Sequence, residues 1–132
     1  MAKKLKAMTF PATVSILGTP WRIEVRDRMK DKDLKDSHAD GYSSFPERLI
    51  VIADLSIDPI FAEDEQGFID ELMKRCLRHE IVHAFLDESG LCHDASRFSG
   101  PWPKNEEMVD WISLQGPKIA KAWHECGIFE SF

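Results

Sequence analysis

The chain has few cysteines, a single tyrosine and no long hydrophobic run. Its cysteines, Cys76, Cys92 and Cys126, are widely spaced and odd in number, which excludes a disulfide framework and indicates a reducing compartment. No apolar stretch approaches the roughly 18 residues that a membrane span needs. The lysine-containing start also lacks the apolar core of a signal peptide. We therefore expect a cytoplasmic protein that does not enter a membrane.

Basic side chains are outnumbered as well. The sequence has 17 lysines and arginines against 23 acidic residues, which gives a net charge of −6 at pH 7. Binding to nucleic acid phosphates depends on a basic surface, so DNA and RNA are excluded as expected partners. At 132 residues, 43% hydrophobic and 30% charged, the composition is that of one globular domain. We expect a single domain over residues 1–132 with a flexible N-terminus over residues 1–10.

The first half of the sequence has the pattern of a β-sheet. Residues 12–17 and 21–26 alternate between apolar and polar side chains, and the Gly-Thr-Pro sequence at 18–20 predicts a hairpin between them. Residues 26–41 mix both signs of charge and predict a solvated loop. The β-branched run at 48–53 predicts the strongest strand of the chain.

The second half has the pattern of helices. Apolar residues recur at steps of three and four over residues 64–89, which predicts a long helix. Asn105 is a suitable N-cap for a second helix that ends near Gln115. The Gly-Pro pair at 116–117 predicts a break, followed by a last helix that ends at Gly127. Strands followed by helices indicate an α+β domain.

The most informative motif is His79-Glu80-Ile-Val-His83, an HExxH sequence within the predicted long helix. The spacing of four places both imidazoles on one face, one turn apart, so that both can bind one metal ion. Zinc accepts neutral imidazole and leaves one position for water. Glu80, about 100° around the helix, can take a proton from a zinc-bound water as a general base. The alternative is a pair of ordinary histidines on a structural helix.

A catalytic zinc usually has three protein ligands, so the sequence must supply a third. The HExxHxxGxxH class is excluded because the positions three and six residues after His83 are Leu86 and Ser89. The acidic, thiol and imidazole side chains further along the chain remain as candidates: Asp87, Cys92, His93, Glu106 and Glu107.

The segment from Asn105 to Asp110 resembles the NExxxD pattern on the second zinc helix of the gluzincin (thermolysin-like) metallopeptidases. The resemblance implies that Glu106 is the third ligand and that Asp110 hydrogen-bonds a ligand histidine. A carboxylate in that position fixes the tautomer of the imidazole and raises its basicity. Glu107 remains the alternative ligand, because neighbouring helical residues point about 100° apart and only one can face the metal.

The order of the motifs also resembles a small phage-type zincin, related in architecture to the ImmA/IrrE family. One departure is Val109, where the second helix of that family typically has alanine. The resemblance implies a zincin-like α+β fold, with a short N-terminal β-sheet, an HExxH helix and one or two further helices. It also implies a Zn2+-dependent metallopeptidase with a narrow range of peptide or protein substrates.

The sequence leaves alternatives for the substrate-binding strand and for the oxyanion donor. A zincin strand next to the active-site helix can pair with an extended substrate, and residues 48–53 are our candidate if they form an edge, although they could equally be the centre of the sheet. The possible donors to the tetrahedral oxyanion are Tyr42, His93 and His124.

Several cysteine and tryptophan positions have a structural interpretation. Cys76 precedes His79 by three residues, and core packing is favoured over a ligand role. Trp21, Trp111 and Trp123 are expected in the core, and Trp102 is a candidate for the wall of a cleft.

A different class of function is also compatible with the sequence. The chain could be a catalytically silent zincin-like module that binds metal for structure and acts as a protein-interaction or regulatory domain. Glu80 favours the enzyme, because a structural metal site has no need of a base beside its ligands. The same water-activating site could also hydrolyse amides other than peptides.

Overall fold

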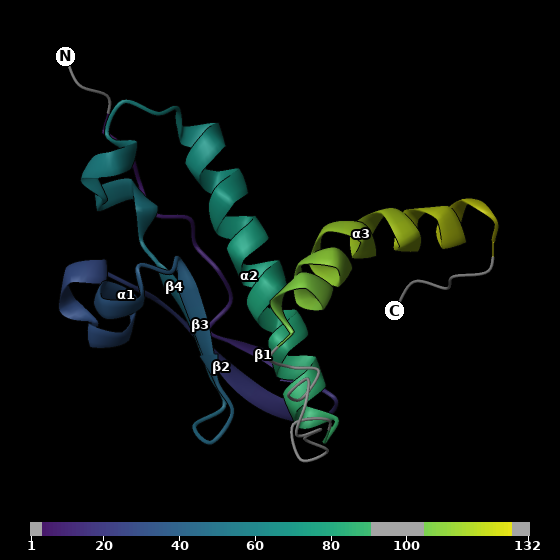
Figure 1. The fold of residues 1–132 in the computed structure, drawn as a ribbon. Helices are drawn as coiled ribbons and strands as arrows, with labels where there is room; N and C mark the ends of the chain where they lie inside the picture. Colours follow the sequence, from purple (N-terminus) through teal and green to yellow (C-terminus); the bar gives the residue numbers. More distant parts are fainter. Residues whose placement is uncertain (1–3, 91–104, 128–132) are drawn as a thin grey trace.

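The computed structural model describes residues 4–90 and 105–127, and these form an α+β fold (Figure 1). The α+β class predicted from the sequence is confirmed. The strands are β1 (Thr13–Ile16), β2 (Thr19–Arg26), β3 (Gly41–Ser44) and β4 (Leu49–Ala53). The α-helices are α1 (Lys32–Ser37), α2 (Gln66–Glu88) and α3 (Glu106–Glu125), and short 3-10 turns cover Arg28–Lys30, Leu55–Ile57 and Pro59–Phe61.

The four strands form one mixed sheet in the order β1-β2-β4-β3. The predicted hairpin is confirmed, because β1 and β2 are antiparallel with Ile16 opposite Thr19. The turn consists of Leu17 and Gly18 alone, both at positive φ, which matches a two-residue loop to the twist of its strands. The turn is therefore shorter than the sequence suggested, and Thr19 already belongs to β2.

Strand β4 lies in the interior of the sheet. It is parallel to β2 on one side and antiparallel to β3 on the other, and all five of its residues are buried. The hypothesis that residues 48–53 offer a free edge to a substrate is therefore wrong. A continuous apolar run without alternation is typical of a strand that is covered on both faces.

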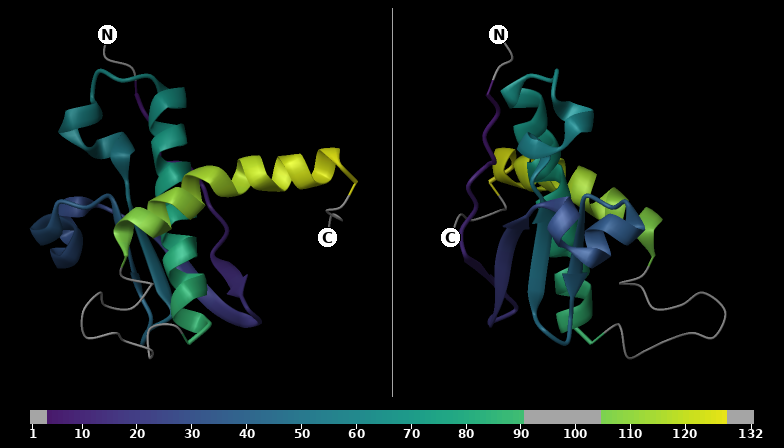
Figure 2. Two further views of the ribbon diagram at one scale, coloured as in Figure 1. Left: turned by 45° about the vertical axis from the view of Figure 1, so that its right-hand side comes forward. Right: turned by 90° about the vertical axis from the view of Figure 1, so that its left-hand side faces the viewer.

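Helix α2 lies across one face of this sheet and packs against β1, β3 and β4 (Figures 1 and 2). Its extent confirms the predicted helix at 64–89. Trp21, on β2, is fully buried and donates from Nε1 to Glu88 near the end of α2. Arg48, just before β4, forms an ion pair with the same Glu88 carboxylate at 2.8 Å. These contacts fix the C-terminal half of α2 on the sheet.

The prediction of a loop at residues 26–41 is wrong. This segment contains the 3-10 turn Arg28–Lys30 and helix α1, and β3 begins at its end. The structure arises from local side-chain hydrogen bonds: Asp27 caps the 3-10 turn and Asp31 caps α1 through the amide of Leu34. Short polar elements of this kind have no hydrophobic period, so the charge pattern alone did not reveal them.

The break predicted at Gly116-Pro117 is also wrong. Helix α3 continues through both residues to Glu125, and Asn105 caps its start by accepting from the amide of Met108, as expected. Figures 1 and 2 show that α3 crosses α2 and bends near its middle. Proline lacks the N–H that would bond to the residue four positions earlier, and it bends helices that it does not end.

The described part of the N-terminal segment contacts the rest of the fold: the backbone of Lys6 exchanges two hydrogen bonds with the Gln66 side chain and Phe10 packs against the core. The expectation for the tryptophans needs correction. Trp111 and Trp123 are 58% and 49% exposed, so only Trp21 of the three tryptophans predicted to be buried belongs to the core.

None of the helices in the described ranges has the length and apolar character of a membrane span.

Candidate metal centre

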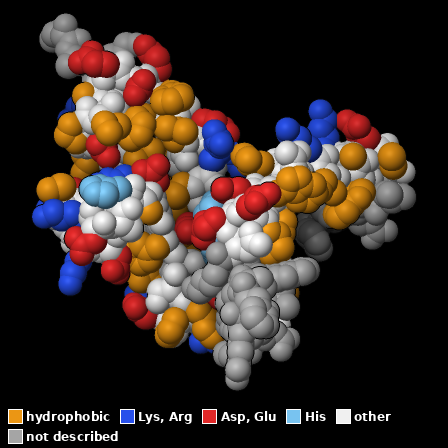
Figure 3. Space-filling model, viewed as in Figure 1, with side chains coloured by type: hydrophobic (Ala, Val, Ile, Leu, Met, Phe, Trp, Pro, Cys, Tyr) orange, Lys and Arg blue, Asp and Glu red, His pale blue; other side chains and the backbone are white. Residues whose placement is uncertain are grey.

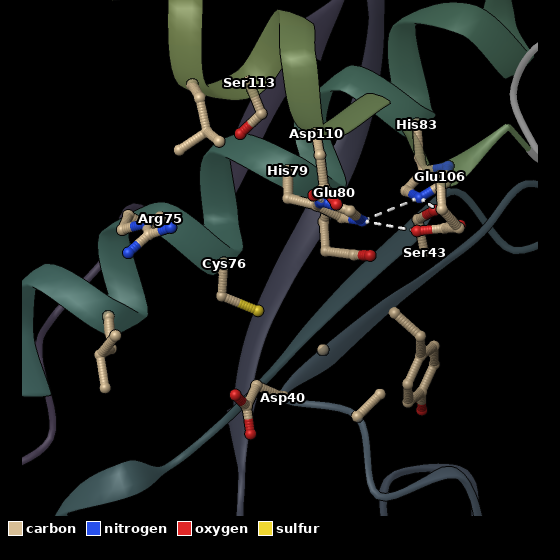
Figure 4. A pocket seen from close by; sticks show the side chains of 15 residues that line it. Asp40, Ser43, Arg75, Cys76, His79, Glu80, His83, Glu106, Asp110 and Ser113 are labelled. Carbon is tan, nitrogen blue, oxygen red and sulfur yellow. Dashed lines mark hydrogen bonds and ion pairs between the residues drawn. The ribbon is translucent and has the colours of Figure 1, made fainter. Parts of the chain in front are cut away.

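The HExxH motif lies in the C-terminal half of α2, on the side that faces α3 (Figure 4). The buried face of α2 passes through Met73, Glu80 and His83, while His79 lies beside that face with about a quarter of its side chain exposed. Helix α3 packs against α2 mainly through the buried Val109 and Ser113. This packing brings the first turn of α3 over the two histidines.

Three side chains, those of His79, His83 and Glu106, form a triangle at this crossing. The Nε2 atoms of His79 and His83 are 3.1 Å apart. The Glu106 carboxylate lies 3.1 Å from each of them, through Oε2 to His79 and through Oε1 to His83. Figure 4 shows the three side chains pointing toward one another. The arrangement gathers two imidazole nitrogens and one carboxylate in one place.

Asp110 contacts the other ring nitrogen of His79. Its Oδ1 lies 2.6 Å from Nδ1 of His79, one helical turn after Glu106 on α3. A carboxylate at Nδ1 holds the proton on that nitrogen and leaves the Nε2 lone pair available to a metal ion. The arrangement predicted for Asp110 from the sequence is therefore present as geometry.

Glu80 lies beside the triangle. Its residue is 4% exposed, and one of its carboxylate oxygens, with the two histidine nitrogens, makes up a set of atoms all within 4.8 Å of one another. In Figure 4 its carboxylate points into the cleft rather than between the histidines. The position suits contact with a small molecule at the centre of the site.

The triangle opens into a cleft of about 670 Å³ between α2, α3 and the start of β3. Figure 3 shows acidic side chains at the start of α3, beside a hollow in which a histidine is visible. The cleft is lined by residues from the end of the α1–β3 loop, from β3 and from both long helices: Ala39, Asp40, Gly41, Tyr42, Ser43, Leu72, Arg75, Cys76, His79, Glu80, His83, Glu106, Asp110, Ser113 and Leu114.

Strand β3 forms the wall of the cleft opposite α2. Among the described residues it pairs with β4 alone, so its other edge borders the cleft. The strand approaches α2 closely at Gly41, where an added Cβ would lie 2.6 Å from Sγ of Cys76 and 2.9 Å from the carbonyl of Val51. Glycine at this position therefore allows the edge to lie alongside the histidines.

Cys76 packs below the site rather than completing it. It is partly buried against the core, and its Sγ lies against Gly41 at the start of β3. Burial raises the pKa of this thiol, and the nearby carboxylates of Glu80 and Asp40 raise it further. A neutral, buried thiol agrees with the core role favoured from the sequence.

Two of the remaining candidate ligands, Glu107 and Asp87, lie away from the triangle. Glu107 borders a separate hollow with Trp111, and Asp87 is buried outside the cleft. Cys92, His93 and Trp102 fall outside the described residues. The geometry thus brings Glu106, and not Glu107, to the two histidines.

Two of the three oxyanion donors proposed from the sequence, His124 and Tyr42, are not at the centre, and His93 falls outside the described residues. His124 lies 18 positions after Glu106 on α3, which is about 27 Å along the helix axis. Tyr42 lines the cleft, but its hydroxyl donates to Asp31 and accepts from Arg26. Burial and the hydrogen bond to Asp31 raise the pKa of Tyr42 to about 12. Tyr42 therefore serves a structural network next to the site.

Four polar or charged lining residues were not predicted from the sequence: Asp40, Ser43, Arg75 and Ser113. The signal for Arg75 was its position four residues before His79, which places both on one face of α2. Ser43 belongs to a strand of four small or polar residues, Gly41–Ser44, for which no periodic signal exists.

Comparisons with known proteins identify no family. No protein-family model matches the chain, and neither a curated protein nor a solved structure matches it. The resemblance to zincins and to the ImmA/IrrE family thus has no independent support from these comparisons, and the His79-Glu80-His83 group is the feature of the chain that is compatible with it.

Proposed function

We propose that the protein is a zinc-dependent peptidase with a zincin-like fold, in which His79, His83 and Glu106 bind the metal and Glu80 is the general base. The observation that carries this proposal is the triangle of side chains, in which the two Nε2 atoms are 3.1 Å apart and each lies 3.1 Å from one of the two Glu106 carboxylate oxygens. The triangle joins residues that are more than twenty positions apart in the sequence.

The dimensions of the triangle fit a tetrahedral zinc ion. Zinc bonds to histidine nitrogen and carboxylate oxygen at about 2.0–2.2 Å. At tetrahedral angles, two such ligand atoms are separated by about 3.3 Å, close to the observed 3.1 Å. Two imidazoles and one carboxylate form the donor set of a catalytic zinc, with the fourth position open. The second carboxylate, Asp110, is placed to orient His79.

Zinc bound there supplies a Lewis acid that polarises a carbonyl oxygen and lowers the pKa of water. The chain itself supplies the proton transfer. Glu80, buried beside the ligand atoms, accepts the proton from the attacking water as the water oxygen bonds to the carbonyl carbon. Glu80 then delivers that proton to the amine nitrogen as the C–N bond breaks. Burial of Glu80 shields this transfer from bulk solvent.

The free edge of β3 is the proposed binding site for an extended substrate. Its backbone groups from Gly41 to Ser43 border the cleft opposite the histidines, and an added peptide strand would continue the sheet by main-chain hydrogen bonds. The substrate strand would then lie between β3 and the HExxH turn of α2. This assignment replaces β4, which is interior.

The decisive experiment compares the wild-type protein with Glu80→Gln. We expect about one zinc per chain in both proteins, measured by atomic emission after removal of loose metal, because Glu80 is not among the proposed ligands. We expect cleavage of a peptide library to fall by at least about 10²-fold in the variant, since one general base typically contributes 10²–10⁴-fold.

Glu107→Gln is the matched control, because Glu107 lies outside the cleft on the same helical turn as Glu106. It should leave zinc content and cleavage unchanged, whereas Glu106→Gln should lower the affinity for zinc. Zinc that is held without any cleavage would favour the silent protein-interaction module instead. A purified protein that binds no zinc would remove the basis of the proposal.

A further inference from the structure

Arg75 lies in the candidate cleft without an ion-pair partner among the residues that the structure describes. It precedes His79 by one turn of α2, lines the cleft and is exposed. Figure 4 shows its side chain at the opposite end of the cleft from Glu106, with Cys76 between it and β3. The apolar Leu72 lines the same end. The guanidinium therefore stands beside the path that the β3 edge defines.

The neighbouring carboxylates are already occupied. Asp40 pairs with Arg28 at 2.6 Å, and Asp110 lies against His79. Glu106 contacts both histidines, and Glu71, one turn before Arg75, pairs with Arg78. Within residues 4–90 and 105–127, Arg75 forms no ion pair and no side-chain hydrogen bond. Its planar fork of N–H donors is available to a ligand.

The guanidinium group of Arg75 favours a carboxylate as its ligand. A guanidinium binds carboxylate in a bidentate manner, with charge-assisted hydrogen bonds that are stronger than neutral ones. Apart from the histidines, the other ionisable groups that line the cleft are Cys76, Tyr42 and the acidic side chains. Arg75 is therefore the cleft's cationic contact for an anionic part of a substrate.

We propose that Arg75 is a specificity-determining residue that binds a carboxylate of the peptide substrate, either an aspartate or glutamate side chain or the C-terminal carboxylate. The inference rests on the proposed peptidase function. Four positions separate Arg75 from His79, which is about 6 Å along the helix axis. An extended peptide rises about 3.3 Å per residue. The recognised carboxylate therefore belongs to a residue about two positions from the cleaved bond.

The test uses an equimolar library of synthetic peptides with every amino acid at every position, with cleavage sites read by mass spectrometry. Half of each set has a free C-terminus and half is amidated. The wild-type protein should cut preferentially where an acidic side chain occupies one fixed position, or where the free C-terminus does. Loss of the preference on amidation identifies the C-terminal carboxylate, and retention identifies the side chain.

Arg75→Gln should remove this preference. For the best acidic peptide we expect KM to rise about tenfold, which corresponds to about 1.4 kcal/mol, with kcat within about twofold. Its neutral amide analogue should be cut equally by both proteins. Arg75→Glu should shift the preference toward lysine and arginine at the same position. Lys74→Gln is the matched control, since Lys74 is exposed next to Arg75 but does not line the cleft.

The outcomes separate this inference from the proposed function. Cleavage by the wild-type protein without any dependence on carboxylates, or an unchanged preference in Arg75→Gln, overturns the role of Arg75 and leaves the peptidase intact. A wild-type, zinc-loaded protein that cuts no peptide of the library overturns both. Equal melting temperatures of the wild type and the variants show that an altered preference does not come from misfolding.

Discussion

The contact between Asp110 and His79 is the clearest case in which a single side chain outside the proposed ligand set controls the site. At 2.6 Å from Nδ1, the carboxylate is placed to orient the ring. The Asp110 side chain is 60% exposed, so its contact with His79 contributes little to the stability of the fold. Its effect should therefore appear in metal affinity rather than in stability.

We predict that Asp110→Ala lowers the affinity for zinc by about 10–100-fold, the usual effect of removing a group that orients a metal ligand. The free energy of unfolding of the metal-free protein should change by less than about 1 kcal/mol. Competition with a chromogenic chelator measures the first quantity and urea unfolding in EDTA the second. An unaltered zinc affinity would show that Asp110 does not orient His79.

A second residue-scale prediction concerns the network under β3. Asp31 is buried and accepts from Arg26, from the amide of Leu34 and from the Tyr42 hydroxyl. Burial acts to raise the pKa of Asp31, but these hydrogen bonds, Arg26 foremost, lower it below its usual value overall. The folded protein therefore binds this proton less readily than the unfolded chain.

The sign of the pH dependence follows from this shift. Stability from Asp31 is fully present above the unfolded pKa of about 3.9 and is lost as the pH falls through the lower folded value. We predict that Asp31→Asn flattens this part of the decline in unfolding free energy below pH 4. At pH 7 the variant should be less stable by about 1–3 kcal/mol. Urea unfolding between pH 2.5 and 7 tests both statements.

Among the elements, β3 depends most directly on one position. Gly41→Ala should destabilise the protein by about 1–3 kcal/mol, because the new Cβ meets Cys76 Sγ and the Val51 carbonyl at less than 3 Å. Adding Cys76→Ala should restore part of this loss. Gly67→Ala is the control: nothing lies within 4 Å of its Cβ, and it sits in α2. Chemical denaturation of the four proteins would contradict the packing argument if both glycine variants behaved alike.

The second prediction for an element concerns the bend in α3. Proline at 117 leaves the carbonyl of Ser113 without its helical N–H partner and disfavours the helix at this point. Pro117→Ala should stabilise the protein by up to about 3 kcal/mol and increase the helical signal at 222 nm. Lys118→Ala, at the next exposed position, should leave both nearly unchanged. A loss of stability in Pro117→Ala would mean that the bend itself is required for packing.

The elements also show which parts of the fold were readable from the sequence. Helix α2 was predicted within two residues because Ile69 and Met73 repeat the helical period over a long segment. The whole of α3 was not, since a Gly-Pro pair normally ends a helix, and here the helix continues in spite of the local preference. Strand β3 had no detectable signal, because it is short and its place depends on pairing with β4.

The candidate site was more predictable than its surroundings. His79, Glu80 and His83 are fixed relative to one another by helical spacing alone, so a sequence suffices to place them. The choice of Glu106 over Glu107 depends on how α3 is rotated against α2, which is a property of the packing of Val109 and Ser113. Arg75 and the β3 edge required the tertiary structure, because they approach the site only through the fold.

At the scale of the whole molecule, the triangle joins α2 to α3. Few residues are buried on α3, namely Val109 and Ser113, so the hydrophobic contribution to docking this helix is limited. A metal bound by residues of both helices would further stabilise the contact between α2 and α3, since a ligand that binds only the folded protein raises the free energy of unfolding.

We predict that free zinc at about 100 times its dissociation constant raises the free energy of unfolding by about 2.7 kcal/mol, and that EDTA reverses the change. His83→Ala should abolish the effect, and Glu107→Gln should retain it. Thermal or urea unfolding with and without zinc measures the difference. A stability that is independent of zinc in the wild-type protein would show that no metal links the two helices.

The division of the triangle between two helices also matters during synthesis. A nascent polypeptide that has been translated through α2 carries both histidines and the base, yet it lacks the acidic third member. If the protein is the proposed peptidase, its hydrolysis must then await the emergence of α3 from the ribosome and its docking on α2. Under the proposed function, the translation machinery and the growing chain itself are spared from premature cutting, with no need for a separate inhibitor.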